Sequence, residues 1–311
     1  MNNLNLEELN FIEKQLKFLY GNYFYEKIMN NEKIYMGDYA QENKINMTDC
    51  RHESFLQIIK KYLDKPIENY TFRCNWSDNT IMDEFIITHT RLYNSNSNPI
   101  FFLEHYNNPG NWCFNKDNDN IEFQNKKKEA IWRGSTTGYP EKCEDLNTML
   151  RYKIVSSNFN KKNIDIGFSN GVQAIYENNK TQFDIFFKPR IEITQQYNYK
   201  YIICLEGNDF ATNFIWALNS NCVPLHNYPF KFETWIFGND LIPFVHFIPI
   251  KNDGSDLEYM VNWCIENDIK CKEISENGKE YMKYYNNEQL MDILFIEFFK
   301  IYPTLYSNEI I

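Results

Sequence analysis

The stretch Tyr-Lys-Tyr-Ile-Ile-Cys-Leu-Glu-Gly-Asn-Asp-Phe-Ala-Thr-Asn-Phe-Ile-Trp-Ala-Leu-Asn-Ser at residues 199–220 predicts the fold class. Residues 201–205 form a short apolar, β-branched run that is typical of a buried strand in a parallel sheet. Turn formers follow at residues 206–209, and then apolar residues recur at near-helical spacing, with Asn208 or Asp209 placed to cap the first helical turn. We therefore expect a strand, a tight turn and a helix.

Such a junction lies at the carboxyl edge of an open α/β sheet, where ligands bind and where a helix N-terminus offers free N–H groups to an anion. An ordinary strand–helix unit that binds nothing is the more frequent case for this pattern alone. The pattern indicates where a site would lie, and other residues must show whether there is one.

The flanking sequence continues the alternation of strands and helices. Short strands are expected at residues 130–132, 222–225 and 245–250, and a helix at residues 146–155. Ser255-Asp-Leu-Glu258 has the pattern of a capping box, and the helix after it places its apolar residues on one face. Two further helices are expected, from Cys271 to Tyr285 and around residues 290–298. This order predicts a parallel α/β domain.

The N-terminal part of the chain is expected to begin with two helices, before any strand. An amphipathic helix is expected with Leu9, Ile12, Leu16 and Leu19 on one face, and a second helix should run from about residue 48 to just before Pro66. Residues 70–76 alternate between apolar and polar side chains, which predicts a half-exposed strand that ends close to Asp78. Residues 99–103 should form another strand.

Composition excludes several classes of function. The chain has 311 residues and a formal net charge of −10, so neither nucleic acid nor an anionic membrane surface is expected as its main partner. No apolar run is long enough to span a bilayer, and the N-terminal residues do not resemble a signal peptide. The eight cysteines form no C-x-x-C pair and are interpreted as reduced core residues, so the expected location is cytoplasmic.

Metal, hydrolase and dinucleotide signatures are absent from the sequence. The five histidines show no metal-ligand spacing, and there is no G-x-S-x-G, P-loop or G-x-G-x-x-G motif. Asp117-Asn118-Asp119 matches a D-x-D triplet, but it lies in a hydrophilic run and is interpreted as a solvated loop. Carboxylates and arginines remain as candidates for chemistry.

Four motifs in one order then carry a resemblance. Trp132-Arg133-Gly134-Ser135, the 199–220 stretch, Glu233-Thr-Trp235 and Leu241-Ile-Pro-Phe-Val-His-Phe247 resemble glycosyltransferase family 90, which includes lipopolysaccharide-modifying enzymes and protein O-glucosyltransferases. The resemblance runs from about residue 131 to residue 279. It implies an α/β fold of GT-B type, with two Rossmann-like lobes and the donor site in the C-terminal lobe. It also implies inverting, metal-independent transfer from a UDP-sugar, with no cofactor.

The resemblance also implies site residues. Ser135 corresponds to a serine that contacts the diphosphate, and Arg151 to the arginine that follows this loop. Arg133 is equally able to contact the donor or to brace its strand through a salt bridge. Asn213 stands where the protein O-glucosyltransferases have a second phosphate-binding arginine. Because an asparagine cannot offer a charged fork, phosphate binding is expected to depend more on backbone amides, Lys188 or Arg190. The full donor-binding set is Arg133, Gly134, Ser135, Arg151, Lys188, Arg190, Gly207, Asn208, Asp209, Ala211, Thr212, Asn213 and Glu233.

A carboxylate is expected to take the proton of the acceptor hydroxyl. The family places an aspartate at the end of an N-lobe strand, and Asp78 has that context here. Its rivals are Asp83, Glu84 and Glu104, and the alternative for Asp78 is a turn residue at a strand end.

The expected organisation is an acceptor-side lobe at residues 1–125, a nucleotide-sugar-binding lobe at 126–285 and a final helix at 286–311 that packs back on the first lobe. The predicted function is transfer of a hexose or pentose, glucose or xylose, from a UDP-sugar to a hydroxyl of a glycan or lipopolysaccharide-type acceptor. The alternative is a catalytically silent relative that binds a nucleotide-sugar or glycan as a partner protein.

Overall fold

The computed structural model describes residues 4–29, 34–35, 74–75, 87–88, 90–93, 119–138, 145–236 and 240–307. Contacts divide the chain into two compact units. The first unit comprises Met1–Asn111, Phe232–Gly238 and Lys283–Ile311, and the second comprises Trp112–Lys231 and Asn239–Met282. The lobe boundaries expected at residues 125/126 and 285/286 stay predictions.

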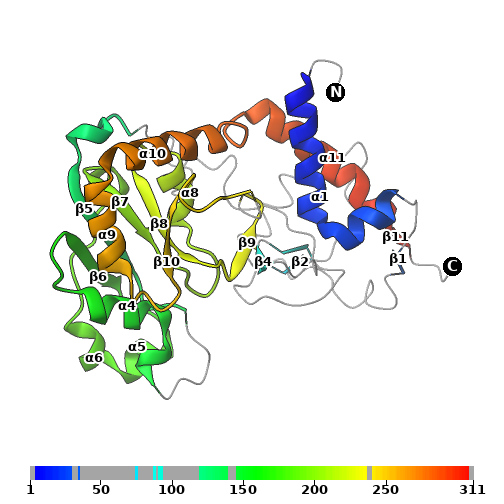
Figure 1. The fold of residues 1–311 in the computed structure, drawn as a ribbon. Helices are drawn as coiled ribbons and strands as arrows, with labels where there is room; N and C mark the ends of the chain where they lie inside the picture. The colour runs from blue at the N-terminus through cyan, green and yellow to red at the C-terminus, as the bar shows by residue number, and fades with distance from the viewer. Residues whose placement is uncertain are drawn as a thin grey trace. The chain divides into compact units, whose positions relative to one another are not determined.

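The second unit is built on a parallel sheet of five strands (Figure 1). In the order in which they pair, the strands are β10 (Ile248–Lys251), β8 (Val223–Tyr228), β7 (Tyr199–Cys204), β5 (Lys127–Ser135) and β6 (Ile164–Asn170). The chain begins at β5, moves outward to β6, and then returns to the other side of β5 for β7, β8 and β10. The strand order therefore reverses between β5 and β7.

Helices cover both faces of this sheet. On one face, alternate strand residues such as Ile166, Ile203 and Leu225 share a buried cluster with Ile154 of α4 (Leu150–Asn158) and Val261 of α9 (Leu257–Glu266). The start of α10 (Asp268–Met282) joins the same cluster. On the other face, His226 of β8 packs on Phe214 of α8 (Asn213–Leu218), with ring centroids 4.5 Å apart. The expected α/β class is confirmed.

Short helical segments connect the strands of the second unit. The 3-10 helix η2 (Phe123–Asn125) precedes β5, and η3 (Leu146–Thr148) precedes α4. Between β6 and β7 lie α5 (Gln173–Asn178), α6 (Lys180–Asp184) and α7 (Ile193–Gln196). Among the residues that the structure describes, no helix is long and apolar enough to cross a membrane.

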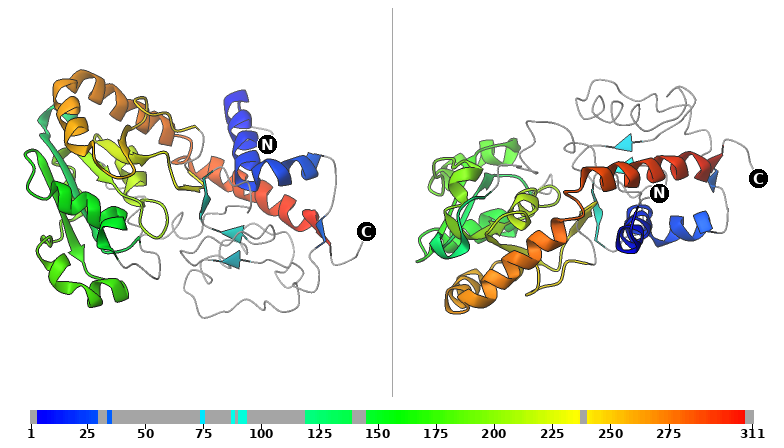
Figure 2. Two further views of the ribbon diagram at one scale, coloured as in Figure 1. Left: turned by 60° about the horizontal axis from the view of Figure 1, so that its bottom comes forward. Right: turned by 90° about the horizontal axis from the view of Figure 1, so that it is seen from above.

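In the first unit, the N-terminal and C-terminal helices lie side by side (Figure 2). The ring of Tyr20 in α1 (Leu6–Met29) stacks on that of Phe298 in α11 (Glu288–Leu305), with centroids 4.7 Å apart. The Tyr20 hydroxyl also donates to the Phe298 carbonyl at 2.7 Å. Short strands complete the described part of this unit: β1 (Ile34–Tyr35) with β11 (Tyr306–Ser307), β2 (Cys74–Asn75) with β3 (Ile87–Thr88), and β4 (Thr90–Leu92) with β9 (Phe232–Thr234).

Two helix caps expected from sequence are wrong. The capping box at residues 255–258 does not form, because α9 begins after Asp256, which makes no side-chain cap hydrogen bond. The Asp256 carboxylate instead accepts the N–H of Lys251 at 2.8 Å, so it closes the turn after β10. Likewise, α8 begins after Thr212 without a side-chain cap, and Asn208 accepts the N–H of Gly138 in another loop. A nearby turn uses the side chain at the N-cap position of α9, and a loop distant in sequence uses Asn208.

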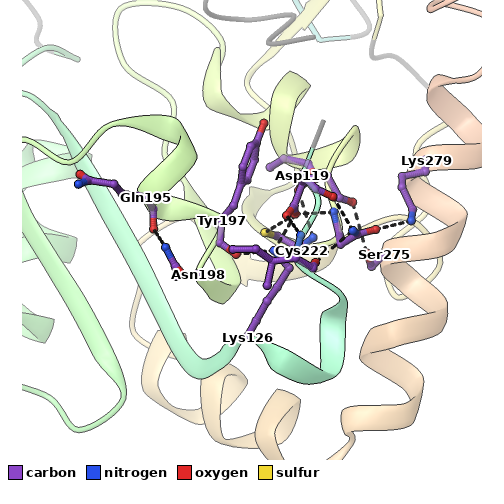
Figure 3. A network of polar contacts seen from close by, with 12 residues as sticks. Asp119, Lys126, Gln195, Tyr197, Asn198, Cys222, Ser275 and Lys279 are labelled. Carbon is purple, nitrogen blue, oxygen red and sulfur yellow. Dashed lines mark hydrogen bonds and ion pairs between the residues drawn. The ribbon is translucent and has the colours of Figure 1, made fainter. Parts of the chain in front are cut away.

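The expectation that the 117–119 triplet forms a solvated loop is wrong for Asp119, because its side chain is buried. The Asp119 carboxylate accepts from Lys126 Nζ at 2.6 Å and from the Asn221 N–H at 2.8 Å, and both side chains of the ion pair are buried. Lys126 also donates to the Tyr197 carbonyl, and Lys279 of α10 reaches the Asn221 side chain (Figure 3). These residues precede β5, β7 and β8, so the network holds together the amino edge of the sheet.

Asp119→Ala should lower the free energy of unfolding by about 3 kcal/mol, because it leaves the buried Lys126 ammonium without its carboxylate. Urea unfolding measures the loss. Lys128→Met is the control, because Lys128 is 54% exposed in its 3.5 Å pair with Asp268. That variant should lose less than about 1 kcal/mol. Equal losses in the two variants would contradict the role of the amino-edge network.

Candidate functional site at the carboxyl edge of the sheet

The candidate site lies where the strand order reverses. In an open parallel sheet, the loops after the two strands that flank such a reversal diverge and leave a crevice at the carboxyl edge. Here these strands are β5 and β7, and the loops that follow them are residues 136–138 and 206–212. The residues expected from sequence include Ser135, the last residue of β5, and Gly207, Asn208 and Asp209 in the second loop.

Arg151 of α4 joins these two loops. Its Nη1 donates to the Ser135 carbonyl at 3.1 Å and to the Thr137 hydroxyl at 2.5 Å, after β5. Its Nη2 donates to the Leu205 carbonyl at 2.8 Å and its Nε to the Glu206 carbonyl at 3.1 Å, after β7. The guanidinium also lies over the Trp132 ring, 5.6 Å from the centroid. One cation therefore fixes both sides of the reversal point.

The charge on Arg151 persists at neutral pH. Burial lowers the pKa of its guanidinium from the ordinary value to about 10, while the negative charges of Asp209 and Glu206 raise it. Since the remaining pKa lies well above 7, the loops surround a permanent positive charge.

Glycines let the two loops approach each other. A Cβ on Gly207 would lie 2.7 Å from Nη2 of Arg151 and 2.8 Å from the Thr137 hydroxyl, so only glycine fits against the guanidinium. Gly138 has a φ of +100°, in the left-handed region that glycine favours, and its N–H donates to the Asn208 side chain at 2.9 Å. Gly207, Asn208 and Ser135 are thus brought together with Arg151, as expected.

The two glycines and three hydroxyl residues at 133–138 suggest a phosphate-contacting loop, but Thr137 is not in the donor-binding set expected from sequence, and Glu206 is missed. Thr137 accepts from Arg151, and its hydroxyl lies 3.3 Å from that of Ser135. Glu206 is only 3% exposed, although it was treated only as a turn former. A carboxylate placed directly between an apolar strand and a glycine was the signal that could have indicated it.

The structure does not bring Arg133 and Lys188 to these loops. Both bind the Asp165 carboxylate, at 2.9 Å and 2.8 Å respectively. Asp165 lies two positions before Gly167, the register partner of Arg133, so the guanidinium points back along the sheet and away from its carboxyl edge. Burial tends to raise the pKa of Asp165, but hydrogen bonds and charges from Lys188 and Arg133 lower it overall. Of the two roles expected for Arg133, the salt bridge that braces the strand is the one observed.

Other expected residues lie in different surroundings. Arg190 is exposed and pairs with Glu192 at 3.2 Å. Glu233 belongs to the first unit, where it forms a buried ion pair with Arg91, its cross-strand partner between β4 and β9. Asn213 donates to the Ile203 carbonyl at 2.8 Å and so ties α8 to β7. Gly134 packs on the Trp132 ring, since a Cβ there would lie 2.3 Å from it.

The residues that begin α8 follow the Gly207 loop. Ala211 is buried, and its carbonyl accepts the N–H of Phe214 at 2.9 Å. Thr212 is the N-cap. The expected base Asp78 and its rivals Asp83, Glu84 and Glu104 lie outside the described residues. Within the described ranges, no three His, Cys, Asp or Glu side chains gather in a way that could hold a metal ion.

His226 of β8 adjoins Asn227, close to the Glu206 loop. Its Nδ1 is 2.7 Å from the Asn227 carbonyl oxygen, so the neutral ring donates a hydrogen bond there, and its Nε2 has no partner in the part of the chain that the structure describes. Burial lowers the pKa of His226 from 6.5 to about 4. The ring is neutral at physiological pH and belongs to the aromatic core with Phe214, Phe230 and Phe247.

The chain was compared with protein families and with known proteins, and both comparisons found similar sequences. A family model described as glycosyl transferase family 90 matches residues 113–308, more than half of the chain. A protein of Invertebrate iridescent virus 6, Uncharacterized protein 179R, is 28% identical over 222 residues, which are 64% of this chain and 19% of that protein. The O-glucosyltransferase LpsA of Dichelobacter nodosus is 26% identical over 168 residues, 54% of this chain and 46% of LpsA. The chain therefore spans less than half the length of either relative.

Two solved structures share parts of the fold at low similarity. Anabaena Alr3699/HepE in complex with UDP has 10% identity and a TM-score of 0.41, covering 69% of this chain and 63% of HepE. TarM has 12% identity and a TM-score of 0.41, covering 70% of this chain and 43% of TarM.

Gly207→Ala should destabilise the second unit by about 1–3 kcal/mol, because the new methyl group forces Arg151 or Thr137 out of place. Urea unfolding measures the change. Gly278→Ala is the control: its Cβ would lie 3.3 Å from the nearest atoms, in the interior of α10, and alanine favours the helix by about 1 kcal/mol. A Gly207→Ala protein as stable as the control would show that the loops do not need this close approach.

His226→Phe should remove a pH dependence of stability. The unfolded chain takes up this proton as the pH falls through 6.5, whereas the folded chain resists until about 4, so wild-type stability is full above 6.5 and falls below it. The difference in unfolding free energy between wild type and variant should change by about 2 kcal/mol from about pH 7.5 to about pH 5. Parallel pH profiles would contradict the assignment of a buried neutral ring.

Proposed function

Because the chain belongs to glycosyl transferase family 90, we propose that it transfers a sugar from a nucleotide-sugar donor to a hydroxyl group. The observation that supports this most directly is the position of Arg151. Its charge lies between the two loops at the point of strand-order reversal, where open parallel sheets bind their ligands.

The chemistry of the transfer explains why a cation belongs there. When the sugar leaves its donor, negative charge develops on the nucleoside diphosphate, and fixed positive charge or oriented N–H groups stabilise it. Arg151 supplies the charge, and the glycines at 138 and 207 allow backbone groups to approach a phosphate closely. Ser135 and Thr137 add hydroxyl groups beside the guanidinium. We propose that the diphosphate lies against these two loops.

The same arrangement supports transfer without a metal ion. A bound cation such as Mg²⁺ commonly neutralises the phosphates of a nucleotide, and an arginine can take that role. In this proposal Arg151 replaces the metal. Asn213 is tied to β7, and Arg133 and Lys188 are bound to Asp165, so Arg151 is the cation that the described residues bring to these loops.

The finer features of the reaction are also proposals. We propose a two-lobed GT-B architecture, inversion at the anomeric carbon and a UDP-sugar donor, with Asp78 as general base. Since one relative is named an O-glucosyltransferase, glucose is the first donor sugar to test, followed by xylose. A hydroxyl of a glycan or lipopolysaccharide-type molecule would be the acceptor. A cytoplasmic location stays a prediction.

Nucleotide binding tests the proposal first. UDP and UDP-glucose at about 100 times their dissociation constant should stabilise the protein by about 2.7 kcal/mol, seen as a higher thermal unfolding midpoint, with and without EDTA. GDP serves as the control nucleotide. No shift with either uridine compound would overturn the donor site, and a shift that EDTA abolishes would overturn metal independence.

Arg151→Lys should weaken UDP binding by at least about tenfold, because a lysine cannot bind both loops with a planar fork. Isothermal titration calorimetry measures the affinity. The control is Lys153→Gln, which removes a cation from the same helix, 44% exposed and 3.9 Å from Asp253. Arg151→Lys keeps the net charge and Lys153→Gln does not, so wild-type affinity in Arg151→Lys, or an equal loss in both variants, would show that the planar fork of Arg151 has no special role.

Asp78→Asn should abolish transfer to an acceptor while UDP affinity stays at the wild-type level, because a general base acts on the acceptor hydroxyl and not on the nucleotide. Release of UDP with acceptor present measures turnover. Full turnover in this variant would transfer the role to Asp83, Glu84 or Glu104. Absence of turnover in the wild type, together with tight UDP binding, would favour the silent relative.

A further inference from the structure

Glu206 is a buried carboxylate directly beside the candidate diphosphate loops. It follows β7 and precedes Gly207, the glycine that packs on the Arg151 guanidinium. Its side chain is directed into the protein, since the residue is only 3% exposed, so it is not placed to contact a nucleotide. Burying a carboxylate is costly unless hydrogen bonds satisfy it. The hydrogen bonds that it accepts show what it does.

Both oxygens of the carboxylate accept hydrogen bonds from the chain beyond β7. Oε2 accepts from Nδ2 of Asn227 at 2.7 Å, and Oε1 accepts from the N–H of Lys231 at 2.9 Å. The Glu206 N–H donates back to Oδ1 of Asn227 at 3.2 Å, so the two residues bind each other twice. Asn227 is also buried, and its Nδ2 reaches Oδ1 of Asn252 at 3.3 Å. Glu206 thus anchors its loop to the end of β8 and to the turn after it.

The backbone of the same residue faces the other way. The Glu206 carbonyl accepts from Nε of Arg151, and the next residue, Gly207, leaves no space between the loop and the guanidinium. By holding the loop, the Glu206 side chain fixes the position of the carbonyl of the same residue, and this carbonyl orients Arg151. Its negative charge also favours the charged form of Arg151.

We propose that Glu206 is a positioning residue for the nucleotide diphosphate: it holds the β7 loop against β8 so that Arg151 and Gly207 keep their places. The inference rests on the proposed function. Glu206 does not touch the donor and acts through Arg151 and Gly207. Glu206 is not in the donor-binding set expected from sequence, and it is not one of the groups proposed to contact the diphosphate.

The hydrogen-bond pattern requires a carboxylate at this position. In the described part of the chain, Oε2 faces the amide of Asn227 and Oε1 faces the N–H of Lys231, and both of these groups are donors. A glutamine can accept only one of these bonds and must turn its own NH2 group toward the other donor. Turning the Asn227 amide does not help, because its NH2 group would then face the Glu206 N–H. Glu206→Gln therefore keeps the size of the side chain but breaks the match of donors and acceptors.

A second substitution can restore the match. With Asn227→Asp added to Glu206→Gln, the glutamine NH2 group donates to the new carboxylate, and its oxygen accepts from Lys231 as before. The other oxygen of the aspartate accepts the N–H of residue 206. The cost lies at Asn252, which must either turn its amide and give up its 3.2 Å bond to the Pro229 carbonyl or lose the 3.3 Å bond from residue 227. The double variant carries the same net charge as the wild type, because the negative charge moves from residue 206 to its hydrogen-bond partner, residue 227.

The test compares wild type, Glu206→Gln and Glu206→Gln/Asn227→Asp in the full chain. UDP affinity by calorimetry should fall about tenfold or more in the single variant and return to within about threefold of wild type in the double variant. With UDP-glucose, KM for the donor should rise more than kcat falls. Wild-type UDP affinity in the single variant, or no recovery in the double variant, would overturn the inference.

A readout without nucleotide separates this inference from the proposed function. Hydrogen exchange at the Gly138 and Gly207 amides, which donate to Asn208 and Asp209, should be faster in Glu206→Gln and restored in the double variant. If wild type binds no UDP, the proposed function fails while exchange still tests the positioning role; unchanged exchange overturns that role. If the single variant does not fold, Asn252→Ala replaces it, with a smaller increase in exchange expected and an unchanged rate as the contradicting result.

Discussion

The second unit depends on one guanidinium bound to backbone carbonyl groups on both sides of the strand-order reversal. Arg151 donates to the Ser135 carbonyl after β5 and to the Leu205 and Glu206 carbonyls after β7. Backbone carbonyls at strand ends have no sheet partner, and an arginine satisfies several of them with one planar group. The loops of the candidate site therefore have a defined position before any ligand binds, which is the condition for electrostatic stabilisation of a leaving group.

This interaction explains the residues around it. Glycine is required at position 207 because the guanidinium occupies the space where a Cβ would lie. The Thr137 hydroxyl accepts from Arg151, and the Glu206 carboxylate holds the loop from behind through Asn227 and Lys231. The amino edge of the sheet has its own buried ion pair, Asp119 with Lys126. The two edges of the sheet are thus held by separate groups, Arg151 at the carboxyl edge and the Asp119–Lys126 pair at the amino edge.

Sequence alone predicted the elements that hydrophobic patterns control. The strand at residues 201–205, the helix at 146–155, the helix expected to open at residues 255–258 and the loop position of Gly207 agree with the structure to within a few residues, because burial of apolar side chains decides them. The strand expected at residues 130–132 is longer, since β5 continues to Ser135. The prediction that Arg151 belongs to this region came from the resemblance to a family, and the structure adds its contacts. The family itself is confirmed.

Sequence reasoning failed where a polar side chain had several partners within reach. For Arg133 the sequence left two roles open, and it did not show which carboxylate would form the salt bridge, because only the register of β5 and β6 brings Asp165 close. The capping box at residues 255–258 does not form, and the Asn208 side chain, which was expected to cap a helix, accepts from Gly138 in the loop after β5. Asp119 was expected in solvent, but Lys126 and Asn221 bury its carboxylate. Tertiary pairing decides all of these, and a single sequence does not contain it.

The most direct test of the central claim is a crystal structure of the protein with UDP. The account predicts that the diphosphate lies against residues 135–138 and 207–209, with the Arg151 guanidinium within hydrogen-bond distance or separated from it by one loop group, and with Arg133 still bound to Asp165. A diphosphate bound elsewhere, or one bound through Arg133 and Lys188 after they release Asp165, would contradict it.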